Sequence, residues 1–308
     1  MDIKLQKLIR NMQTVIVGED ENIEYIIIAM LSGGHVLLEG LPGVGKTKMA
    51  LALSKSMNGI FKRIQFTPDV LPSDITGYYL YNRNTGEMDY KEGAVGCNFL
   101  LADEINRASP RVQSSLLEAM EERQVTIEGE TKRLPDPFIV IATQNNIENE
   151  GTYPLPEAQL DRFFMKLYMT YPKREEWKRI LKQYNQEEPI NRLSSVVTVE
   201  EFLELKNQVE TIVVSDNLRD YLLDLLEAIG VHETVEIGVN PRGSIALIKG
   251  AQAYAFMQGR EYVVPEDIHK VIVPIIAHRI YLKPGYDNSS VSIQRIIQES
   301  LKKIKAVV

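Results

Sequence analysis

Only one cysteine, Cys97, occurs in the 308 residues, so the chain cannot form an internal disulfide, and this scarcity favours a reducing compartment such as the cytoplasm. Long apolar runs are also missing, because the two longest, residues 25–31 and 271–277, fall far short of the ~20 residues that span a bilayer. Residues 1–10 mix charged with apolar side chains and lack the apolar core of a signal peptide. We therefore expect a cytoplasmic protein without a membrane span.

The sequence has no excess of positive charge and no metal-binding pattern. Its 35 lysines and arginines stand against 42 aspartates and glutamates, and the resulting net charge of −7 argues against a generally basic, nucleic-acid-binding surface without excluding a local basic patch. The four histidines are scattered, without the spacing of metal ligands. With 44% hydrophobic and 25% charged residues, the composition is that of an ordinary globular chain with room for two domains.

Residues 40–47 read Gly-Leu-Pro-Gly-Val-Gly-Lys-Thr and fit the phosphate-binding pattern G-x-x-x-x-G-K-[ST]. Its glycines permit positive-φ geometry, which lets backbone N–H groups converge on phosphate oxygens. The Lys46 charge suits the β- and γ-phosphates, and the Thr47 hydroxyl can ligate Mg²⁺. An apolar strand pattern precedes the loop and a helical pattern follows it, as the motif requires. The candidate nucleotide-binding residues here are Gly40, Pro42, Gly43, Val44, Gly45, Lys46, Thr47 and Lys48.

Strand patterns alternate with helical stretches from residue 34 to about residue 167. The predicted strands are residues 36–38, 63–66, 99–103, 139–143 and 165–168. This alternation is typical of a doubly wound α/β domain with a parallel sheet. Two insertions, the tyrosine-rich residues 77–93 and residues 124–135, carry turn sequences at their middles and predict β-hairpins.

Beyond Pro172 the strand pattern stops and helical patterns continue. Thr198 and Glu201 form a capping box that opens one helix, and Pro265 is suited to the first turn of another. Further helices are predicted over residues 175–184, 218–229 and 242–256. We place a boundary near Tyr171, with an α/β domain over residues 1–171 and a helical domain over residues 172–308.

Polar side chains follow two of the predicted strands. The strand at residues 99–103 ends in Asp103, and Glu104 comes next. Because the carboxyl ends of parallel strands open onto the ligand crevice, Asp103 suits the holding of Mg²⁺ and Glu104 suits the polarising of an attacking water. Asn145 follows another strand and could orient water or touch the γ-phosphate. The alternative for Asn145 is an ordinary asparagine turn after a strand.

Two arginines are candidates for stabilising charge in phosphoryl transfer. Arg162 and Arg242 each lie beside a turn or a helix start. The alternative interpretation is a surface arginine or a structural ion pair, and spacing alone leaves both open.

The combination of motifs resembles the AAA+ ATPases, and specifically their MoxR subfamily. The stretches that carry the resemblance are residues 65–77, Gln-Phe-Thr-Pro-Asp-Val-Leu-Pro-Ser-Asp-Ile-Thr-Gly; residues 101–108, Leu-Ala-Asp-Glu-Ile-Asn-Arg-Ala; residues 115–125, Ser-Leu-Leu-Glu-Ala-Met-Glu-Glu-Arg-Gln-Val; residues 142–145, Ala-Thr-Gln-Asn; and residues 150–163, Glu-Gly-Thr-Tyr-Pro-Leu-Pro-Glu-Ala-Gln-Leu-Asp-Arg-Phe. The resemblance implies an AAA+ P-loop NTPase core with hairpin insertions, followed by an all-α lid domain.

The resemblance also implies individual roles. Lys46 and Thr47 would belong to the Walker A loop, and Asp103 and Glu104 would be the Walker B pair. Asn145 would be sensor 1.

Further roles follow from the same resemblance. Arg162 would be the arginine finger given to a neighbouring subunit, and Arg242 would be sensor 2 in the lid. Residues 15–18 match the segment that packs against adenine, so Val17 and Gly18 join the candidate cofactor-binding residues. The two hairpins would face the pore of a ring or a partner surface.

For function, the resemblance implies a homo-oligomeric ring, commonly a hexamer, that hydrolyses ATP with Mg²⁺. It further implies chaperone-like remodelling or activation of a protein partner, often a von Willebrand factor A domain protein, on a separate chain. Two other functions stay open. One is a nucleic-acid motor, against which the acidic net charge and the absence of an appended DNA-binding motif count. The other is an assembly switch with incidental turnover, against which the Asp103–Glu104 pair counts.

Overall fold

A five-stranded parallel sheet forms the centre of the N-terminal half, in the order β2-β5-β8-β1-β9. The computed structural model describes residues 2–145, 151–183, 188–286 and 289–304. Each strand falls where the sequence predicted one, and their bounds are β1 Val36–Gly40, β2 Phe61–Gln65, β5 Phe99–Asp103, β8 Ile139–Gln144 and β9 Met165–Met169. The predicted doubly wound α/β core is therefore confirmed.

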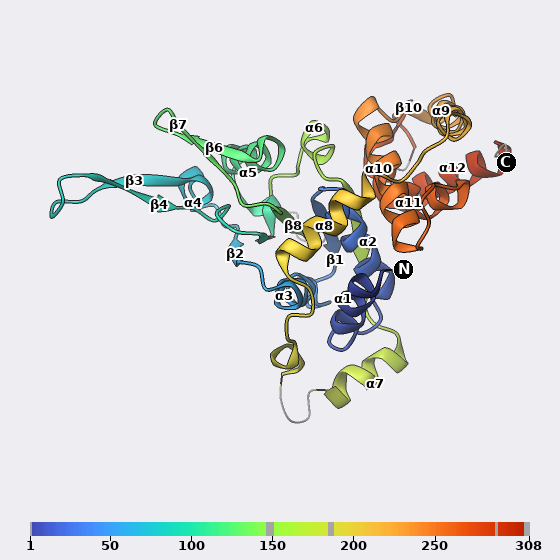
Figure 1. The fold of residues 1–308 in the computed structure, drawn as a ribbon. Helices are drawn as coiled ribbons and strands as arrows, with labels where there is room; N and C mark the ends of the chain where they lie inside the picture. Colours follow the sequence, from blue (N-terminus) through green and yellow to red (C-terminus); the bar gives the residue numbers. More distant parts are fainter. Residues whose placement is uncertain (1, 146–150, 184–187, 287–288, 305–308) are drawn as a thin grey trace.

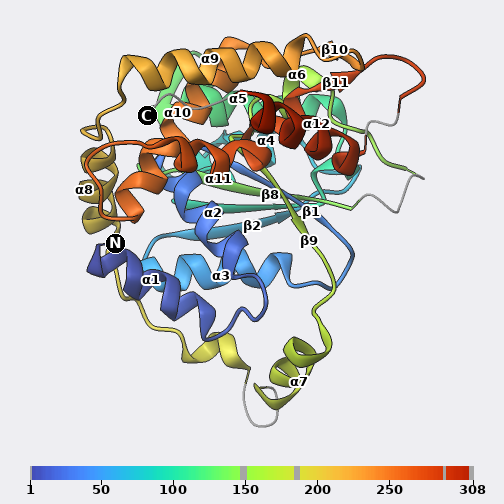
Figure 2. The same cartoon turned by 90° about the vertical axis from the view of Figure 1, so that its right-hand side faces the viewer.

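Helices cover both faces of this sheet, which is why its central strands are apolar throughout. Leu101 and Ile141 pack into one core cluster with three helices, α1 Ile3–Gln13, α2 Asp20–Leu31 and α3 Lys46–Met57. Leu100 and Val140 face the opposite way, into a second cluster with α4 Pro72–Thr76 and α5 Pro110–Glu122. Figure 2 shows α1 and α3 lying along one side of the strands.

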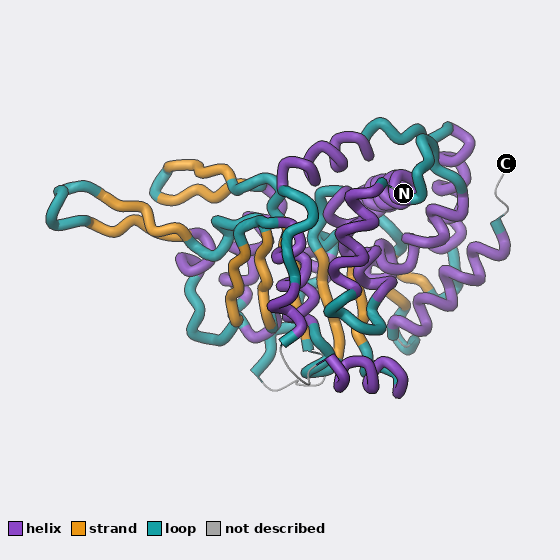
Figure 3. The backbone as a smooth tube through the Cα atoms, turned by 60° about the horizontal axis from the view of Figure 1, so that its bottom comes forward, coloured by secondary structure: helices purple, strands orange, loops and turns teal. Residues whose placement is uncertain are grey.

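Two β-hairpins project from the core to the same side, away from the C-terminal helices (Figures 1 and 3). The first pairs β3 Gly77–Tyr81 with β4 Met88–Glu92, and the second pairs β6 Gln124–Ile127 with β7 Glu130–Arg133. The Tyr79 hydroxyl donates a hydrogen bond to Glu130, and the Lys132 ammonium lies 4.6 Å from the centre of the Tyr90 ring. The predicted hairpins are thus present and tied to each other.

The C-terminal part is predominantly helical, as predicted. Its helices are α8 Val199–Val209, α9 Asp216–Gly230, α10 Pro241–Met257, α11 Pro265–Ile276 and α12 Ser290–Lys303. The Thr198 hydroxyl accepts from the Glu201 N–H at 3.2 Å, which confirms the predicted capping box. The structure also contains a short sheet of β10 Val235–Ile237 and β11 Tyr281–Leu282, which the sequence did not predict. Strands of three and two residues are too short to leave a periodic signal.

Short elements complete the chain. They are α6 Glu157–Leu160, α7 Arg174–Gln183 and three 3₁₀ turns, η1 Ile105–Arg107, η2 Pro189–Arg192 and η3 Ala277–Arg279. The α7 helix buries none of its side chains and lies apart from the other helices (Figure 1). The Gln183 amide donates to the Thr14 carbonyl at 3.1 Å, which joins α7 to the segment after α1. Of the helices that the structure describes, none has the length and hydropathy needed to cross a membrane.

A buried histidine just before β1, His35, bonds to β8 and to α5. His35 Nδ1 accepts from the Val140 N–H at 3.0 Å, so the ring proton is on Nε2, which lies 3.1 Å from the Met120 carbonyl oxygen. Burial lowers the pKa of His35 to about 3, and the nearby charge of Arg123 adds to this effect. Above about pH 3 the folded protein therefore holds His35 neutral.

We predict that this histidine makes the protein sensitive to mild acid. Below the ordinary pKa of 6.5, the unfolded chain binds a proton at His35 and the folded chain does not, until the pH falls to about 3. Stability should therefore decrease by about 1.4 kcal/mol per pH unit from this group alone as pH falls. In urea unfolding at pH 7 and pH 5.5, His35→Asn should lose about 1–2 kcal/mol less than the parent between the two conditions.

The exposed His269 supplies the matched control, since it lies on the surface of α11. His269→Gln should keep the parent's loss of stability between the two pH values. Equal pH dependence in the parent and His35→Asn would contradict the assignment of acid sensitivity to His35.

Candidate functional site

The phosphate-binding loop connects β1 to α3 at the carboxyl edge of the sheet. Gly43 and Gly45 have φ angles of +78° and +102°, a region that side chains strongly disfavour. A β-carbon at either position would meet no atom within 4 Å, so the backbone conformation rather than crowding requires glycine there. The α3 helix starts at Lys46, and its first turn faces the cavity described below.

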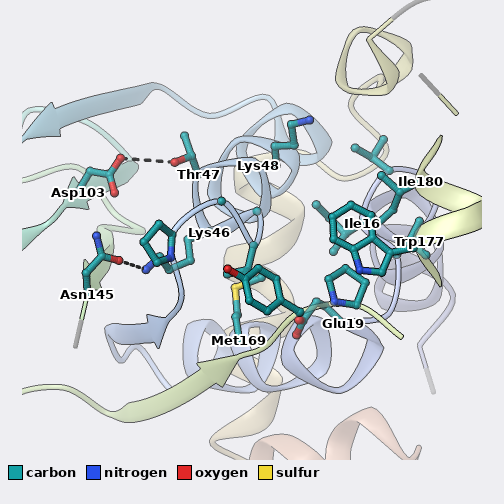
Figure 4. A pocket seen from close by; sticks show the side chains of 18 of the residues that line it. Ile16, Glu19, Lys46, Thr47, Lys48, Asp103, Asn145, Met169, Trp177 and Ile180 are labelled. Atoms are coloured by element: carbon teal, nitrogen blue, oxygen red, sulfur yellow. Dashed lines mark hydrogen bonds between the residues drawn. The ribbon is translucent and has the colours of Figure 1, made fainter. Parts of the chain in front are cut away.

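Asp103 ends β5 close to the start of α3. Its Oδ1 accepts from the Thr143 hydroxyl at 2.6 Å, and its Oδ2 accepts from Arg63 Nη2 at 2.7 Å. The Thr47 hydroxyl lies 3.4 Å from the same Oδ2 (Figure 4). A hydroxyl and a carboxylate at this separation form a donor set of the oxygen type that Mg²⁺ prefers.

Glu104 is held in a left-handed backbone conformation, with φ +58° and ψ +50°. Its N–H donates to the Thr143 hydroxyl at 2.9 Å. Its carboxylate accepts from Asn145 Nδ2 at 2.8 Å and from Gln65 Nε2 at 2.9 Å, and it pairs with Arg107 Nε at 3.0 Å. Such a conformation is uncommon outside glycine and is over-represented at functional sites.

Lys46 reaches across the loop to the end of β8. Its ammonium donates to the Gly40 carbonyl at 2.8 Å and to Asn145 Oδ1 at 2.5 Å (Figure 4). Burial lowers the pKa of Lys46, although Asp103 and Glu104 oppose the shift. Asn145 therefore bridges Lys46 and Glu104, one through its carbonyl oxygen and the other through its amide nitrogen.

A cavity of about 600 Å³ contains these groups at one end and apolar side chains at the other. Figure 4 shows Trp177 and Ile180 of α7 beside Ile16, on the far side of the loop from Asp103. The apolar lining residues are Val15, Ile16, Val17, Val44, Met169, Trp177 and Ile180. Pro42, Gly43 and Lys48 of the same segment also line the cavity.

Gly18 and Gly40 support the cavity without lining it. A β-carbon on Gly18, whose φ is +85°, would lie 2.6 Å from the Glu176 carboxyl carbon, so α7 packs directly against this glycine. A β-carbon on Gly40 would lie 2.3 Å from the Met169 carbonyl oxygen. Both glycines therefore allow close packing around the loop and the apolar end.

Arg162 and Arg242 lie elsewhere. Arg162 Nε is 3.0 Å from one carboxylate oxygen of Glu121, and Arg242 pairs with the other oxygen of the same carboxylate. Among the described residues that line the cavity, neither arginine appears. The structure thus brings the two arginines together with each other, but not with Lys46 and Asp103.

Several residues of the site were not identified from the sequence. Arg63 and Gln65 project from β2 toward Asp103 and Glu104, and Thr143 bonds to both carboxylate residues. Arg63 and Gln65 are two positions apart on the edge strand β2 and so lie on one face of the sheet. This spacing was a sequence signal that the two polar side chains act together. Trp177 and Glu121 lie in unremarkable helical patterns that pointed to no partner.

Comparison with known proteins agrees with this geometry. Residues 35–165 match the family described as "ATPase family associated with various cellular activities (AAA)", and residues 227–300 match the AAA lid domain. The chain is 46% identical to the uncharacterized protein YeaC of Bacillus subtilis, covering 99% of this chain and 95% of YeaC. It is 40% identical to the chaperone MoxR1 of Mycobacterium tuberculosis, covering 98% of this chain and 84% of MoxR1.

A solved structure leads to the same conclusion. The crystal structure of a candidate ATPase from Cytophaga hutchinsonii superposes with a TM-score of 0.90 at 39% identity, covering 99% of this chain and 95% of that one. Since both the sequence relatives and the solved structure match along nearly the whole length, the chain belongs to the MoxR family of AAA+ ATPases.

Proposed function

We propose that this chain binds ATP with Mg²⁺, hydrolyses it as part of a homo-oligomeric ring, and uses turnover to remodel or activate a protein partner. The observation that carries the proposal is the convergence of five predicted groups in one cavity. They are Lys46, Thr47, Asp103, Glu104 and Asn145. This is the set of charges, hydroxyls and carboxylates that phosphoryl transfer to water requires.

The residues present fit ATP and Mg²⁺. The positive-φ loop offers a cradle in which β-carbons at Gly43 and Gly45 would meet nothing, and Lys46 supplies a buried positive charge beside it. Thr47 and Asp103 would hold the metal, which supplies neutralisation of phosphate charge when bound. Glu104 would accept the proton of the attacking water, and Asn145 would orient that water while fixing Glu104.

The apolar end of the cavity suits a purine base. Ile16, Val17 and Trp177 offer flat and aliphatic surface on either side of a slot, and Gly18 lets α7 approach. The sequence has no guanine-reading Asn-Lys-x-Asp stretch after the phosphate loop. We therefore propose adenine as the base.

Arg162 would complete the site of a neighbouring subunit. Arg162 is not among the described residues that line the cavity of its own subunit. Its partner Glu121 is partly exposed, so Arg162 is available at the surface. Arg242 shares Glu121 and would be presented together with it. A head-to-tail interface that closes into a ring, expected to be a hexamer from the family resemblance, would place both arginines against the next cavity.

The partner would be a protein, and a von Willebrand factor A domain protein on another chain is our proposal. The MoxR1 relative is named a chaperone, which supports a role on protein. The first hairpin exposes apolar side chains suited to such contact, namely Tyr78, Leu80, Tyr81 and Met88. We further propose a domain boundary near Tyr171, just after β9, and a cytoplasmic location, for which the single buried cysteine is the support.

Two substitutions should separate nucleotide binding from ATP hydrolysis. Glu104→Gln should keep ATP binding and abolish turnover, because the amide cannot accept a proton from water. Lys46→Ala should weaken nucleotide binding itself. Steady-state phosphate release and equilibrium binding measure the two effects, with Glu227→Gln on the exposed face of α9 as control. A Glu104→Gln protein that hydrolyses ATP at the parent rate would remove Glu104 from the role of base.

The preference for adenine over guanine can be tested through Trp177. Trp177 is the only tryptophan of the chain and lines the cavity, so its fluorescence reports occupancy of the apolar end. ATP should change this fluorescence at lower concentration than GTP and give a higher kcat/KM, because the apolar lining suits adenine and the sequence has no Asn-Lys-x-Asp stretch to read guanine. Equal kcat/KM for the two nucleotides would count against an adenine slot.

Mixing of subunits can test whether Arg162 acts in the site of a neighbouring subunit. A finger supplied by a neighbour can be worth about 10³–10⁵ in rate, so Arg162→Ala should be nearly inactive. When Arg162→Ala subunits are mixed with Glu104→Gln subunits, some sites regain an intact Glu104 together with a neighbour's Arg162. Activity should then exceed that of either variant alone. Exchange of subunits without any recovery would return Arg162 to a structural ion pair.

A further inference from the structure

A second, fully buried arginine lies behind the segment that carries Arg162. Arg279 ends the 3₁₀ turn η3 after α11, and its side chain is 2% exposed. It therefore belongs to the helical part, yet it extends into residues 161–164 of the α/β part. It is not among the described residues that line the nucleotide cavity.

All five N–H donors of this guanidinium are used. Nε donates to Asp161 Oδ1 at 2.7 Å, and Nη2 donates to the carbonyl oxygens of Asp161 at 3.0 Å and Phe163 at 2.8 Å. Nη1 donates to the Phe164 carbonyl at 3.4 Å and to the Ile275 carbonyl. Burial lowers the pKa of Arg279, and the adjacent Asp161 carboxylate opposes that shift.

These bonds fix the backbone on both sides of Arg162. The Arg279 guanidinium contacts the residue before Arg162 and the two residues after it, while the Arg162 side chain points to Glu121. His278 Nε2 lies 3.1 Å from the same Phe163 carbonyl oxygen and adds a second contact from η3. Three of the four residues in this segment are therefore held by the helical part.

The same junction includes the start of α10, which carries Arg242. The Asn240 amide donates to Asp161 Oδ2 at 2.9 Å, and Arg242 Nη1 lies 3.6 Å from that oxygen. A β-carbon on Gly243 would lie 2.9 Å from Arg279 Cδ, so this glycine leaves the room that the Arg279 side chain occupies. Asp161 thus connects η3, α10 and the Arg162 segment.

We propose that Arg279 is a positioning residue for Arg162, which ties the place of the arginine finger to the place of the helical lid. The proposal rests on the trans role of Arg162. A misplacement of about 1 Å by a residue remote from the chemistry can lower a rate about 10²-fold, so the backbone on which the finger is mounted must be held firmly.

The test uses Arg279→Lys in the full-length protein. A lysine ammonium has three donors and can keep the pair with Asp161, but it cannot reach all the carbonyl oxygens that the guanidinium binds. We expect ATP turnover to fall about 10–10²-fold. Nucleotide affinity, measured through Trp177 fluorescence, should stay within about twofold of the parent, since the cavity is untouched.

Two further variants complete the test, one at a pair away from residues 161–164 and one at the partner of Arg279. Arg260→Lys alters another arginine–aspartate pair of the helical part, in which Arg260 binds the buried Asp267 without touching residues 161–164, and it should keep the parent rate. Asp161→Asn keeps the side-chain shape but removes the charge that Arg279 contacts, and it should show the same loss as Arg279→Lys.

Subunit mixing distinguishes a finger defect from a general defect. Arg279→Lys subunits mixed with Glu104→Gln subunits should regain activity, because their intact Glu104 then receives a well-placed Arg162 from the neighbour. Arg279→Lys mixed with Arg162→Ala should not regain activity, because every finger is misplaced or missing.

The results distinguish the positioning role of Arg279 from the action of Arg162 on a neighbouring subunit. Parental turnover in folded Arg279→Lys overturns the positioning role. So does a failure of Arg279→Lys to recover with Glu104→Gln when Arg162→Ala does recover, since the defect then lies in its own cavity. If Arg162→Ala itself fails to recover although subunits exchange, the trans finger is wrong and the positioning role falls with it.

Discussion

The parallel pairing of β1, β5 and β8 is the constraint on which the site depends. Parallel neighbours end at the same edge, so the loop after β1, the carboxylates after β5 and the amide after β8 must meet there. The hydrogen-bonded link from Lys46 through Asn145 to Glu104 follows directly from that register. Thr143, one strand over from Asp103, can bond both carboxylate residues for the same reason.

The sequence predicted those parts whose signal is local. An apolar run that ends in Asp103–Glu104, or a glycine loop before Lys46, can be recognised within ten residues, and the hairpins and the capping box at Thr198 are similarly local. Arg63 and Trp177 could not be assigned in this way, because their relevance depends on which distant strand or loop lies beside them. Arg279 is the extreme case, since its partners Asp161, Phe163 and Phe164 are 115 to 118 residues away along the chain.

The two ends of the cavity differ in how firmly they are built. The phosphate end stands on the buried strands β1, β5 and β8, so its geometry is set by the core itself. The apolar end is closed by α7, none of whose side chains is buried. The Gln183–Thr14 hydrogen bond and the packing of Glu176 on Gly18 join this helix to residues 14–18. A helix without a buried face is expected to open locally at a lower cost than the buried strands of the phosphate end.

The arginines show the same division between fixed and movable parts. Arg162 and Arg242 share Glu121 in partly exposed pairs, and such pairs contribute only ~0–1 kcal/mol, so either side chain can leave Glu121 at little cost. Arg279 is different, because a buried guanidinium is tolerated only when all its donors are satisfied, and removing one partner of a buried ion pair is strongly destabilising. The weakly paired Arg162 side chain is therefore mounted on backbone that buried hydrogen bonds from the helical part hold in place. In the ring proposed above, movement of the helical part relative to the sheet would carry Arg162 with it and so alter the site of the next subunit.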